Sequence, residues 1–209
     1  ADLVDKRKIK LIPNGIDSGE FFEEPSNIIY KRMADEFVLC NLGRLVQQKN
    51  QTFLIDLAVE LKKRRFNFKL IIGGSGPLES ELKQKAAALG VADSIVFLGF
   101  IERPKDVYFS GDIFVLPSLW EGFGYVLAEA GLCSLPSVAF NSSSNSQIIQ
   151  DGKTGILVPE QNHVLFADAV IKLAENDKMR KEMGEAAKSF VMKNFEADQI
   201  FKKIEDAII

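Results

Sequence analysis

Two glutamates frame the segment whose residue types are best suited to chemistry, PSLWEGFGYVLAEA at positions 117–130. Glu121 stands just before a glycine-flanked turn, and Glu129 stands in an otherwise apolar stretch that is predicted to be helical. A carboxylate in apolar surroundings is costly without a partner, so we expect Glu129 to meet a ligand or another polar group. Eight helical positions would separate the two carboxylates by roughly 12 Å along the axis, and a non-helical turn would shorten this distance. Such a span could bind the two ends of one ligand.

The residues between the two glutamates, Gly122, Phe123 and Gly124, would present backbone N–H groups at the start of that helix. A helix N-terminus attracts anions because its unpaired N–H groups and its dipole carry partial positive charge. The segment therefore predicts a ligand that has hydroxyl groups at both ends and phosphate near the middle. A helix cap combined with a buried ion pair is the plainer alternative.

Two cations, Arg44 and Lys49, follow the first predicted strand, five residues apart at a strand-to-helix turn. At such a turn they can converge with helix N–H groups on one phosphate. Two solvated surface charges would give the same sequence pattern, so this alternative stays open.

A glycine-rich loop, GGSGP at 73–77, follows the second predicted strand. Pro77 would stand near the first position of the next helix, as helix starts prefer, and the glycines would let an anion approach the backbone closely. A dinucleotide fingerprint needs G-x-G-x-x-G after the first strand, whereas this loop follows the second and has Glu79 in place of the third glycine. An oxidoreductase domain is therefore disfavoured, and a tight turn that needs glycine remains an alternative.

Composition narrows the chemistry further. The chain has 209 residues, of which 46% are hydrophobic and 26% charged, as in an ordinary globular domain. A formal net charge of -3 leaves no field that would attract a nucleic acid. The single histidine, His163, and the two cysteines, Cys40 and Cys133, are too few for a four-ligand zinc site or an H-E-x-x-H helix. Both cysteines lie in apolar runs that suit buried, reduced thiols, which favours a reducing compartment.

Apolar runs that alternate with helical patterns indicate the elements that must position these residues. Such runs are typical of strands buried on both faces, and strands separated by helices pair in parallel through right-handed crossovers. We therefore predict an α/β fold, a Rossmann-like doubly wound parallel sheet of about six strands whose carboxyl ends carry the loops described above. Three C-terminal helices should flank the sheet. The predicted strands are 37–43, 68–74, 94–100, 112–118, 137–140 and 154–159, and the predicted helices are 50–64, 78–89, 124–133, 164–175, 178–191 and 197–208, with short helical turns near 107 and 147.

A series of motifs resembles the C-terminal, donor-binding domain of the GT-B-fold retaining glycosyltransferases of the group 1, or family 4, type. Phosphorylases and nucleotide-sugar epimerases share this architecture but not the set of motifs. The resemblance covers roughly residues 9–160 and implies one half of a GT-B fold, with a UDP-sugar or GDP-sugar as donor and a hexose as the transferred group. The motifs are IPNGID (12–17), LGRLVQQKN (42–50), IIGGSGP (71–77), VFLGF (96–100), PSLWEGFGYVLAEA (117–130) and DGKTGILV (151–158).

The resemblance implies roles for individual residues. Arg44 and Lys49 would bind the diphosphate and stabilise it as the leaving group. Glu121 would bind sugar hydroxyls, and Glu129 would accept hydrogen bonds from the ribose hydroxyls. The other donor-binding positions are Gly74 and Gly76 in the glycine loop, Gly99 and Phe100 beside the nucleobase, and Gly122, Phe123 and Gly124 with N–H groups for sugar or phosphate.

No metal ion and no cofactor are expected at this site. Breaking a glycosidic bond to a diphosphate develops negative charge on the departing oxygen, and paired cations with helix N–H groups stabilise that charge in the transition state. The chain also contains no Asp-x-Asp pair that would bind a metal. The nucleotide-sugar is therefore expected as a substrate that needs no metal.

The loop at 141–147, NSSSNSQ, departs from the family pattern, which has a glycine pair followed by a glutamate here. Because both glycines and the glutamate are replaced between Ser142 and Gln147, an altered donor specificity and a weakened activity both stay open. The alternative function is a catalytically inactive nucleotide-binding module that regulates or binds a partner.

The resemblance divides the chain into an interdomain linker, 1–36, and a nucleotide-sugar-binding domain, 37–209. The N-terminal domain that would bind the acceptor has no counterpart here, so we expect this chain alone to bind donor without turnover. Its longest apolar stretches, such as 95–101, are far shorter than the roughly 20 residues that span a bilayer. A cytoplasmic location is expected, and any contact with the inner face of the membrane would be made by the absent domain.

Overall fold

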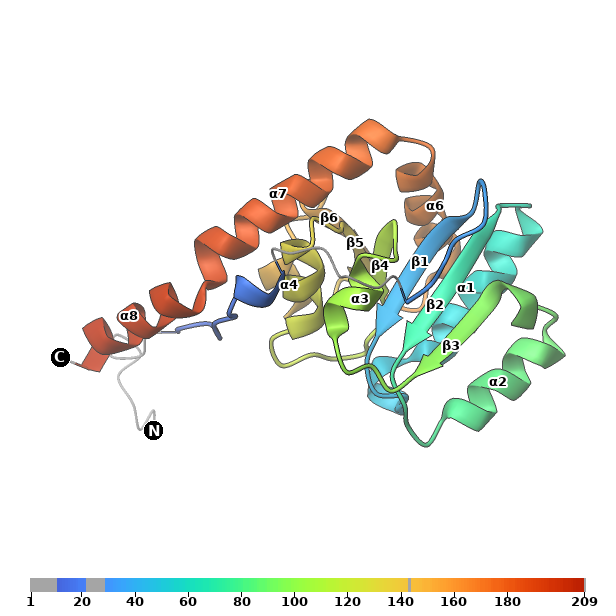
Figure 1. Ribbon diagram of the computed structural model, residues 1–209, viewed down its shortest axis with the longest axis horizontal. Coiled ribbons are helices and arrows are strands. Elements are labelled where there is room, and N and C mark those ends of the chain that lie inside the picture. Colours follow the sequence, from blue (N-terminus) through green and yellow to red (C-terminus); the bar gives the residue numbers. More distant parts are fainter. Residues whose placement is uncertain (1–10, 22–28, 143, 209) are drawn as a thin grey trace, which may run out of the picture.

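One parallel β-sheet forms the centre of the computed structural model, which describes residues 11–21, 29–142 and 144–208 (Figure 1). The strand order β3-β2-β1-β4-β5-β6 confirms the predicted doubly wound topology. The order reverses between β1 and β4, and ligands of such sheets bind beyond the carboxyl ends of the strands at this switch point. The strands are β1 (Phe37–Leu42), β2 (Phe68–Gly73), β3 (Ile95–Gly99), β4 (Ile113–Leu116), β5 (Ser137–Phe140) and β6 (Gly155–Val158).

Helices cover both faces of this sheet (Figure 1). On one face α1 packs against α2 and α6, and on the other face α4 packs against α3, α5 and α7. The helices are α1 (Gln51–Lys63), α2 (Glu79–Ala88), α3 (Pro104–Tyr108), α4 (Tyr125–Leu132), α5 (Asn145–Ile148), α6 (His163–Ala174), α7 (Asp177–Phe195) and α8 (Ala197–Ile208).

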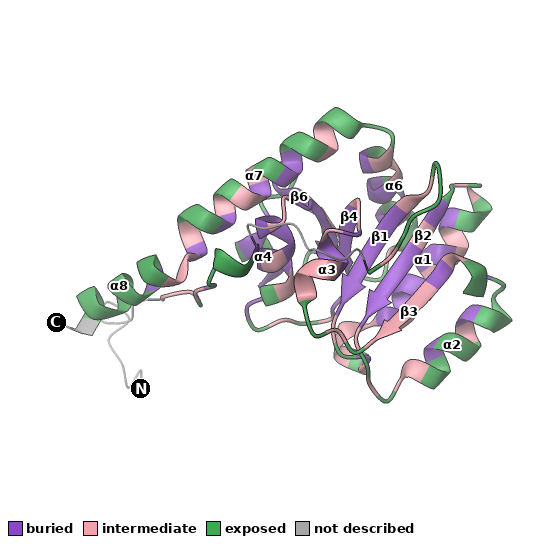
Figure 2. Ribbon diagram, in the orientation of Figure 1, coloured by how far each residue is buried: buried purple, intermediate pink, exposed green. Residues whose placement is uncertain are grey.

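Strand side chains alternate between two hydrophobic cores, one under each helical layer. Figure 2 shows that strands β1 and β2 are mostly buried. In β1, Leu39 belongs to the core beneath α1, α2 and α6, whereas Val38 and Cys40 belong to the core beneath α3, α4 and α7. The alternation follows from the two-residue repeat of a strand. Because both faces are buried, each strand needs apolar residues throughout, which is why the strands appear in the sequence as continuous apolar runs.

Helix α4 begins one residue later than predicted. It starts at Tyr125 because Gly124 adopts a φ of 88°, a left-handed conformation that lies outside the helix. The turn after Glu121 is therefore not helical, and the eight-residue helical spacing between Glu121 and Glu129 does not apply, since only Glu129 lies on α4. Pro77 stands two residues before Glu79, the first residue of α2, and so lies near the helix start as predicted.

The prediction that three C-terminal helices flank the sheet is correct for α6 and α7 and wrong for α8. Helix α8 continues α7 beyond the sheet (Figure 1), and its Phe201 is 63% exposed. Its start is fixed by Ile16, whose N–H donates to the Phe195 carbonyl (2.8 Å) and whose carbonyl accepts from the Ala197 N–H (3.0 Å). The two hydrogen bonds of Ile16 thus hold the junction between α7 and α8, beyond which α8 extends away from the sheet (Figure 1).

The described part of the predicted linker packs against the domain. Ile16 and Phe21 are buried in the core beneath α3, α4 and α7. Residues 1–10 and 22–28 of that linker lie outside the described residues. The assignment of 1–36 as an interdomain linker stays a prediction.

Both cysteines are free thiols that serve as packing groups. Cys40 is buried, and Cys133 is half-buried. Burial raises the pKa of the Cys133 thiol to about 12 and raises that of Cys40 well above its ordinary value. Both thiols are therefore protonated at neutral pH.

Candidate functional site

An open cleft of about 480 Å³ lies at the carboxyl edge of the sheet, at the switch point. It brings together four of the predicted site residues, Arg44, Gly74, Phe100 and Glu129, from four different loops or helices. The remaining lining is largely apolar and comes from Leu42, Ile101, Pro104 and Val126, with Gly43 and Ser75. A cleft of this size with a few polar groups on an apolar lining is typical of a small-molecule site.

Arg44 is the exposed cation of the cleft. Its backbone follows β1, and its carbonyl accepts a hydrogen bond from the Gln51 side chain at 3.0 Å. Within the part of the chain that the structure describes, no carboxylate pairs with its guanidinium. An arginine that is fixed at its backbone and unpaired at its head can bind an anionic ligand.

Glu129 is the carboxylate of the cleft, and Tyr108 orients it. The Tyr108 hydroxyl, on α3, donates to Glu129 Oε2 at 2.5 Å. Burial raises the pKa of Glu129, and the hydrogen bond from Tyr108 opposes this effect, as does the nearby Lys49 charge. Among the described residues none donates a hydrogen bond to Oε1. This oxygen is available to accept a hydrogen bond from a ligand hydroxyl.

No motif or spacing in the sequence pointed directly to Tyr108. Only the expectation that Glu129 must have a polar partner pointed to such a residue, and periodicity could not say which one. Tyr108 is fully buried against Phe114, with ring centroids 5.5 Å apart. The ring therefore fixes the hydroxyl rigidly beside the carboxylate.

Lys49 and Glu121 form an ion pair with Nζ and Oε1 2.6 Å apart. The two side chains are 18% and 8% exposed, so the pair lies at the edge of the interior. The aliphatic part of Lys49 covers Gly43, which lines the cleft: a Cβ placed at Gly43 would lie 3.5 Å from three carbons of that side chain. The Lys49–Glu121 pair is also what the plainer alternative, a structural ion pair, would produce. A ligand-binding role for these two residues therefore depends on the cleft beside them.

The glycine loop after β2 is shaped by the loop after β1. Gly74 has a φ of 125°, and a Cβ there would clash with the Gly43 carbonyl. A Cβ at Gly76 would clash with the Leu45 backbone, whose N–H donates to the Ser75 carbonyl at 3.0 Å. Of the two predicted glycines, Gly74 lines the cleft and Gly76 does not appear in its described lining.

The predicted nucleobase segment lies at the rim of the cleft. Gly99 has a φ of 72°, and its carbonyl accepts the Gly74 N–H at 2.7 Å, which joins this segment to the glycine loop. Phe100 is 80% exposed and lines the cleft. An exposed aromatic ring at a cleft rim can stack on a flat ligand group.

The segment that precedes α4, residues 122–124, can contact a ligand with backbone groups but not with side chains. Gly122 is exposed, with open space where a Cβ would stand. The Phe123 ring is buried and packs edge-to-face on Phe195, with centroids 5.4 Å apart. Gly124 precedes the first turn of α4. These three residues can therefore contact a ligand through their N–H groups and not through side chains.

No three histidine, cysteine or acidic side chains gather as potential metal ligands within the described ranges. Nor does any helix in these ranges have the length and apolarity needed to cross a bilayer. The expectation that no metal is needed stays a prediction.

The chain is similar to known proteins in both sequence and structure. The sequence profile of the family described as "Glycosyl transferases group 1" matches residues 25–190. An uncharacterized glycosyltransferase of Methanocaldococcus jannaschii is 33% identical over 207 residues, which are 94% of this chain and 52% of that protein. The GDP-mannose-dependent alpha-(1-6)-phosphatidylinositol monomannoside mannosyltransferase of Mycolicibacterium smegmatis is 31% identical over 198 residues, 88% of this chain and 52% of that protein.

A crystal structure of Anabaena Alr3699/HepE in complex with UDP and glucose shares the fold. It superposes with a TM-score of 0.84 at 24% identity and covers 95% of this chain and 56% of the Anabaena chain. This chain therefore spans about half the length of the proteins that it resembles.

Proposed function

Because this chain belongs to the group 1 glycosyltransferase family, we propose that it binds a UDP-sugar or GDP-sugar in the cleft at the carboxyl edge of its sheet. As the donor-binding half of a retaining glycosyltransferase, it would supply a hexose to an acceptor. The observation that carries this proposal is that Arg44 and Glu129 line one cleft with complementary chemistry.

In this proposal Arg44 binds the diphosphate and Glu129 binds the ribose. The guanidinium is exposed and unpaired among the described residues, and it can form two parallel hydrogen bonds to phosphate oxygens. Glu129 Oε1 accepts from a ribose hydroxyl while Tyr108 orients the carboxylate. Phe100 at the rim, next to Gly99, stacks on the nucleobase.

Lys49 and Glu121 serve the sugar end of the donor. The aliphatic part of Lys49 lies against Gly43, which lines the cleft, and its ammonium pairs with Glu121. In this proposal that ammonium adds positive charge near the departing diphosphate. Glu121 binds sugar hydroxyls, and the backbone N–H groups of Phe123 and Gly124 contact the sugar or phosphate. Gly122 leaves open space beside them.

Chemistry at the anomeric carbon depends on stabilising the leaving group. As the glycosidic bond breaks, negative charge grows on the diphosphate oxygen, and the two cations interact more strongly with the transition state than with the bound donor. Neither cation has to gain or lose a proton. No metal is required in this proposal because the protein itself supplies the positive charge.

The names of related proteins support a nucleotide-sugar without selecting its base. One relative is named for GDP-mannose, and the Anabaena structure contains UDP and glucose. The chain spans about half the length of these proteins. We therefore propose that an acceptor-binding domain outside this chain completes the enzyme, and that this chain alone binds donor without transferring sugar.

Calorimetric titration of the chain with UDP, GDP and ADP tests the donor site. We expect saturable binding of one nucleotide and a loss of about tenfold to a hundredfold in affinity for Arg44→Ala, the effect of removing charge-assisted hydrogen bonds. Lys63→Ala, an exposed cation at the end of α1, is the charge-matched control and should bind like the original chain. Failure of the folded chain to bind any of the three nucleotides would refute the donor site.

One observation favours a second candidate, an inactive nucleotide-binding module. The loop at 141–147 lacks the glycine pair and glutamate of the family pattern, and its Ser143 lies outside the described residues. Transfer of sugar by the longer protein that contains this chain would exclude that candidate. Nucleotide binding without transfer in that longer protein would favour it.

A further inference from the structure

Side chains from both neighbouring loops bind the backbone of the loop that carries Glu121. Four carbonyls of this loop, between β4 and α4, each accept one side-chain hydrogen bond. The pairs are Asn50 Nδ2 to the Pro117 carbonyl (3.2 Å), Ser142 Oγ to Ser118 (3.2 Å), Gln48 Nε2 to Trp120 (2.9 Å) and Ser144 Oγ to Glu121 (3.1 Å).

The first pair of donors flanks Lys49 on the loop after β1. The backbone carbonyl of Gln48 also accepts the Leu119 N–H at 2.9 Å, so Gln48 binds the Glu121 loop with both its side chain and its backbone. Asn50 has a left-handed φ of 52°, a conformation that asparagine tolerates better than most residues. Three consecutive residues, 48–50, thus bind one loop, and the middle one is the lysine that pairs with Glu121.

The second pair of donors, Ser142 and Ser144, lies in the loop where the family pattern has glycines. Both serines are buried, at 8% and 5% exposure. Glycine has no side chain, so a glycine at either position could not donate the hydrogen bond that the serine makes here. Part of the loop that departs from the family pattern thus binds the Glu121 loop in this chain.

We propose that Gln48, Asn50, Ser142 and Ser144 form a two-sided clamp that positions Glu121 and the N–H groups after it for the sugar of the donor. This inference rests on the proposed function. All four donors are neutral, so the clamp fixes geometry and leaves the charge of the Lys49–Glu121 pair unchanged. A site whose loop is already ordered loses less conformational entropy when it binds.

The clamp acts more on the sugar than on the nucleotide. Arg44, Phe100 and Glu129 lie outside the clamped loop, and they would still bind the diphosphate, base and ribose after the clamp is weakened. Weakening it should therefore lower affinity for a nucleotide-sugar more than affinity for the free nucleotide. The ratio of the two affinities separates a positioning role from general destabilisation.

The test compares single variants of the chain. Ser144→Ala and Asn50→Gly each remove one donor, and glycine retains the left-handed backbone at position 50. Ser146→Ala and Gln47→Ala are the matched controls, because both are exposed neighbours whose side chains form no hydrogen bond with another described residue. Ser144→Thr retains the hydroxyl and should restore the behaviour of the original chain.

Titration with UDP, GDP, UDP-glucose and GDP-mannose measures the affinity ratio. In Ser144→Ala and Asn50→Gly, we expect the preference for the nucleotide-sugar over its nucleotide to fall about three- to tenfold, as for loss of one neutral hydrogen bond. The control variants and Ser144→Thr should keep the original ratio. Equal ratios in all variants of a chain that does bind UDP-glucose or GDP-mannose would overturn the clamp.

Hydrogen–deuterium exchange keeps the clamp testable if the proposed donor site is wrong. Should none of these ligands bind, the proposed function fails, and exchange at the backbone amides of 118–124 decides the clamp alone. We expect faster exchange of this segment in Ser144→Ala and Asn50→Gly than in Ser146→Ala and Gln47→Ala, with exchange in β1 unchanged. Equal exchange in the four variants would overturn the clamp.

Discussion

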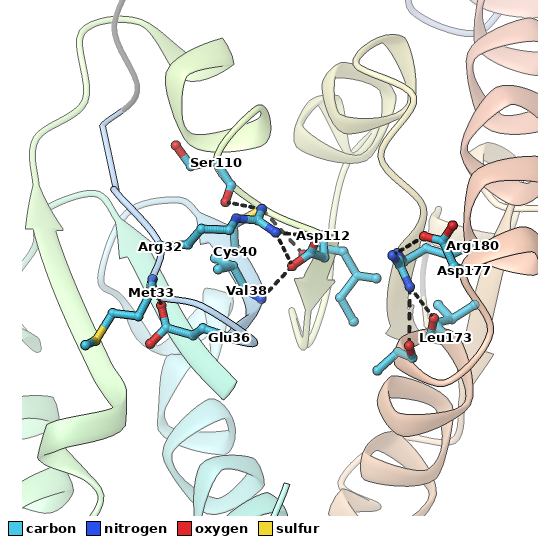
Figure 3. A network of polar contacts seen from close by, with 12 residues as sticks. Arg32, Met33, Glu36, Val38, Cys40, Ser110, Asp112, Leu173, Asp177 and Arg180 are labelled. Atoms are coloured by element: carbon cyan, nitrogen blue, oxygen red, sulfur yellow. Dashed lines mark hydrogen bonds and ion pairs between the residues drawn. The ribbon is translucent and has the colours of Figure 1, made fainter. Parts of the chain in front are cut away.

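The two edges of the sheet differ in how far their charged side chains are bound by other groups of the protein. At the amino edge, Asp112 accepts hydrogen bonds from Arg32 Nη1 at 2.9 and 3.0 Å and from the Val38 N–H at 2.8 Å (Figure 3). At the carboxyl edge, no described carboxylate pairs with Arg44, and no described residue donates to Oε1 of Glu129. Paired charges thus connect the starts of the strands. At the carboxyl edge one ion pair, Lys49–Glu121, stands beside two groups that are open to a ligand, Arg44 and Oε1 of Glu129.

A second arginine at the amino edge follows the same rule. Arg180 donates to the Leu173 carbonyl at 2.9 Å and to Asp177 at 2.6 Å (Figure 3), and its guanidinium lies 5.2 Å from the centre of the Phe37 ring. Three arginines border a hollow at this edge, and two of them, Arg32 and Arg180, are already bound by protein groups. The comparison teaches that burial and charge alone do not mark a site: open charged groups must also line one cleft with complementary chemistry.

The largest change in the free energy of unfolding is expected when the ion pair at the amino edge is removed. Asp112→Ala should lower the free energy of unfolding by about 2 to 3 kcal/mol, because Arg32 and the buried Val38 N–H both lose their acceptor. Urea unfolding measures this loss, and nucleotide titration of the folded variant should give the original affinity. Asp93→Ala is the control, since the Asp93 ion pair with Lys62 is exposed and should contribute less than about 0.5 kcal/mol. A folded Asp112→Ala chain that no longer binds nucleotide would contradict the separation of the two edges.

A smaller effect of opposite sign is expected at the carboxyl edge. Glu129→Gln should raise the free energy of unfolding by about 0.5 to 1 kcal/mol at neutral pH, because a desolvated charge is removed while Tyr108 keeps an acceptor. If Glu129 binds the ribose as proposed, the same change should weaken nucleotide binding about tenfold, since a neutral amide replaces the carboxylate. Glu102→Gln, at an exposed position after β3, should change neither quantity.

The stability difference at Glu129 should depend on pH. Because burial raises the pKa of Glu129, the folded chain binds this proton more tightly than the unfolded chain. The resulting stabilisation is present at acidic pH and is lost as the pH rises through the folded-state pKa. Urea midpoints measured from about pH 4 to pH 8 should therefore show that the stability of Glu129→Gln, relative to that of the original chain, increases as the pH rises. A gap that stays constant or narrows would show that Glu129 is not destabilised by burial.

Local patterns were sufficient to predict the elements of the fold. The apolar runs predicted β1 and β4 because both strands are buried on both faces, and their order follows from the crossover rule. The exact start of α4 depended on the left-handed conformation of Gly124, which a glycine permits but does not require. The direction of α8 depended on a contact with Ile16, far away in the sequence.

The candidate site was predicted in its residues but not in its contacts. The motifs identified Arg44 and Glu129, which the structure places in one cleft. They did not indicate that Lys49 would pair with Glu121, because that contact joins residues 72 positions apart. Ser144 was noted only as a departure from a pattern. Neutral side chains that bind loop carbonyls have no periodicity, so such contacts become visible only when the loops are placed in space.

The most direct comparison of the two edges makes the same substitution at one arginine of each, Arg32 and Arg44. The smallest changes in the free energy of unfolding are expected here. Arg32→Gln should lower the free energy of unfolding by about 1 kcal/mol, a value limited by the 44% exposure of the Arg32 side chain, and should leave nucleotide affinity unchanged. Arg44→Gln should change the free energy of unfolding by less than about 0.5 kcal/mol, because no described carboxylate pairs with it, and should weaken nucleotide binding. Urea unfolding and calorimetry on the same two proteins measure both quantities. If Arg44→Gln proved the more destabilising of the two, Arg44 would be part of the structural framework, and the contrast between the edges would fail at the residue on which it depends most.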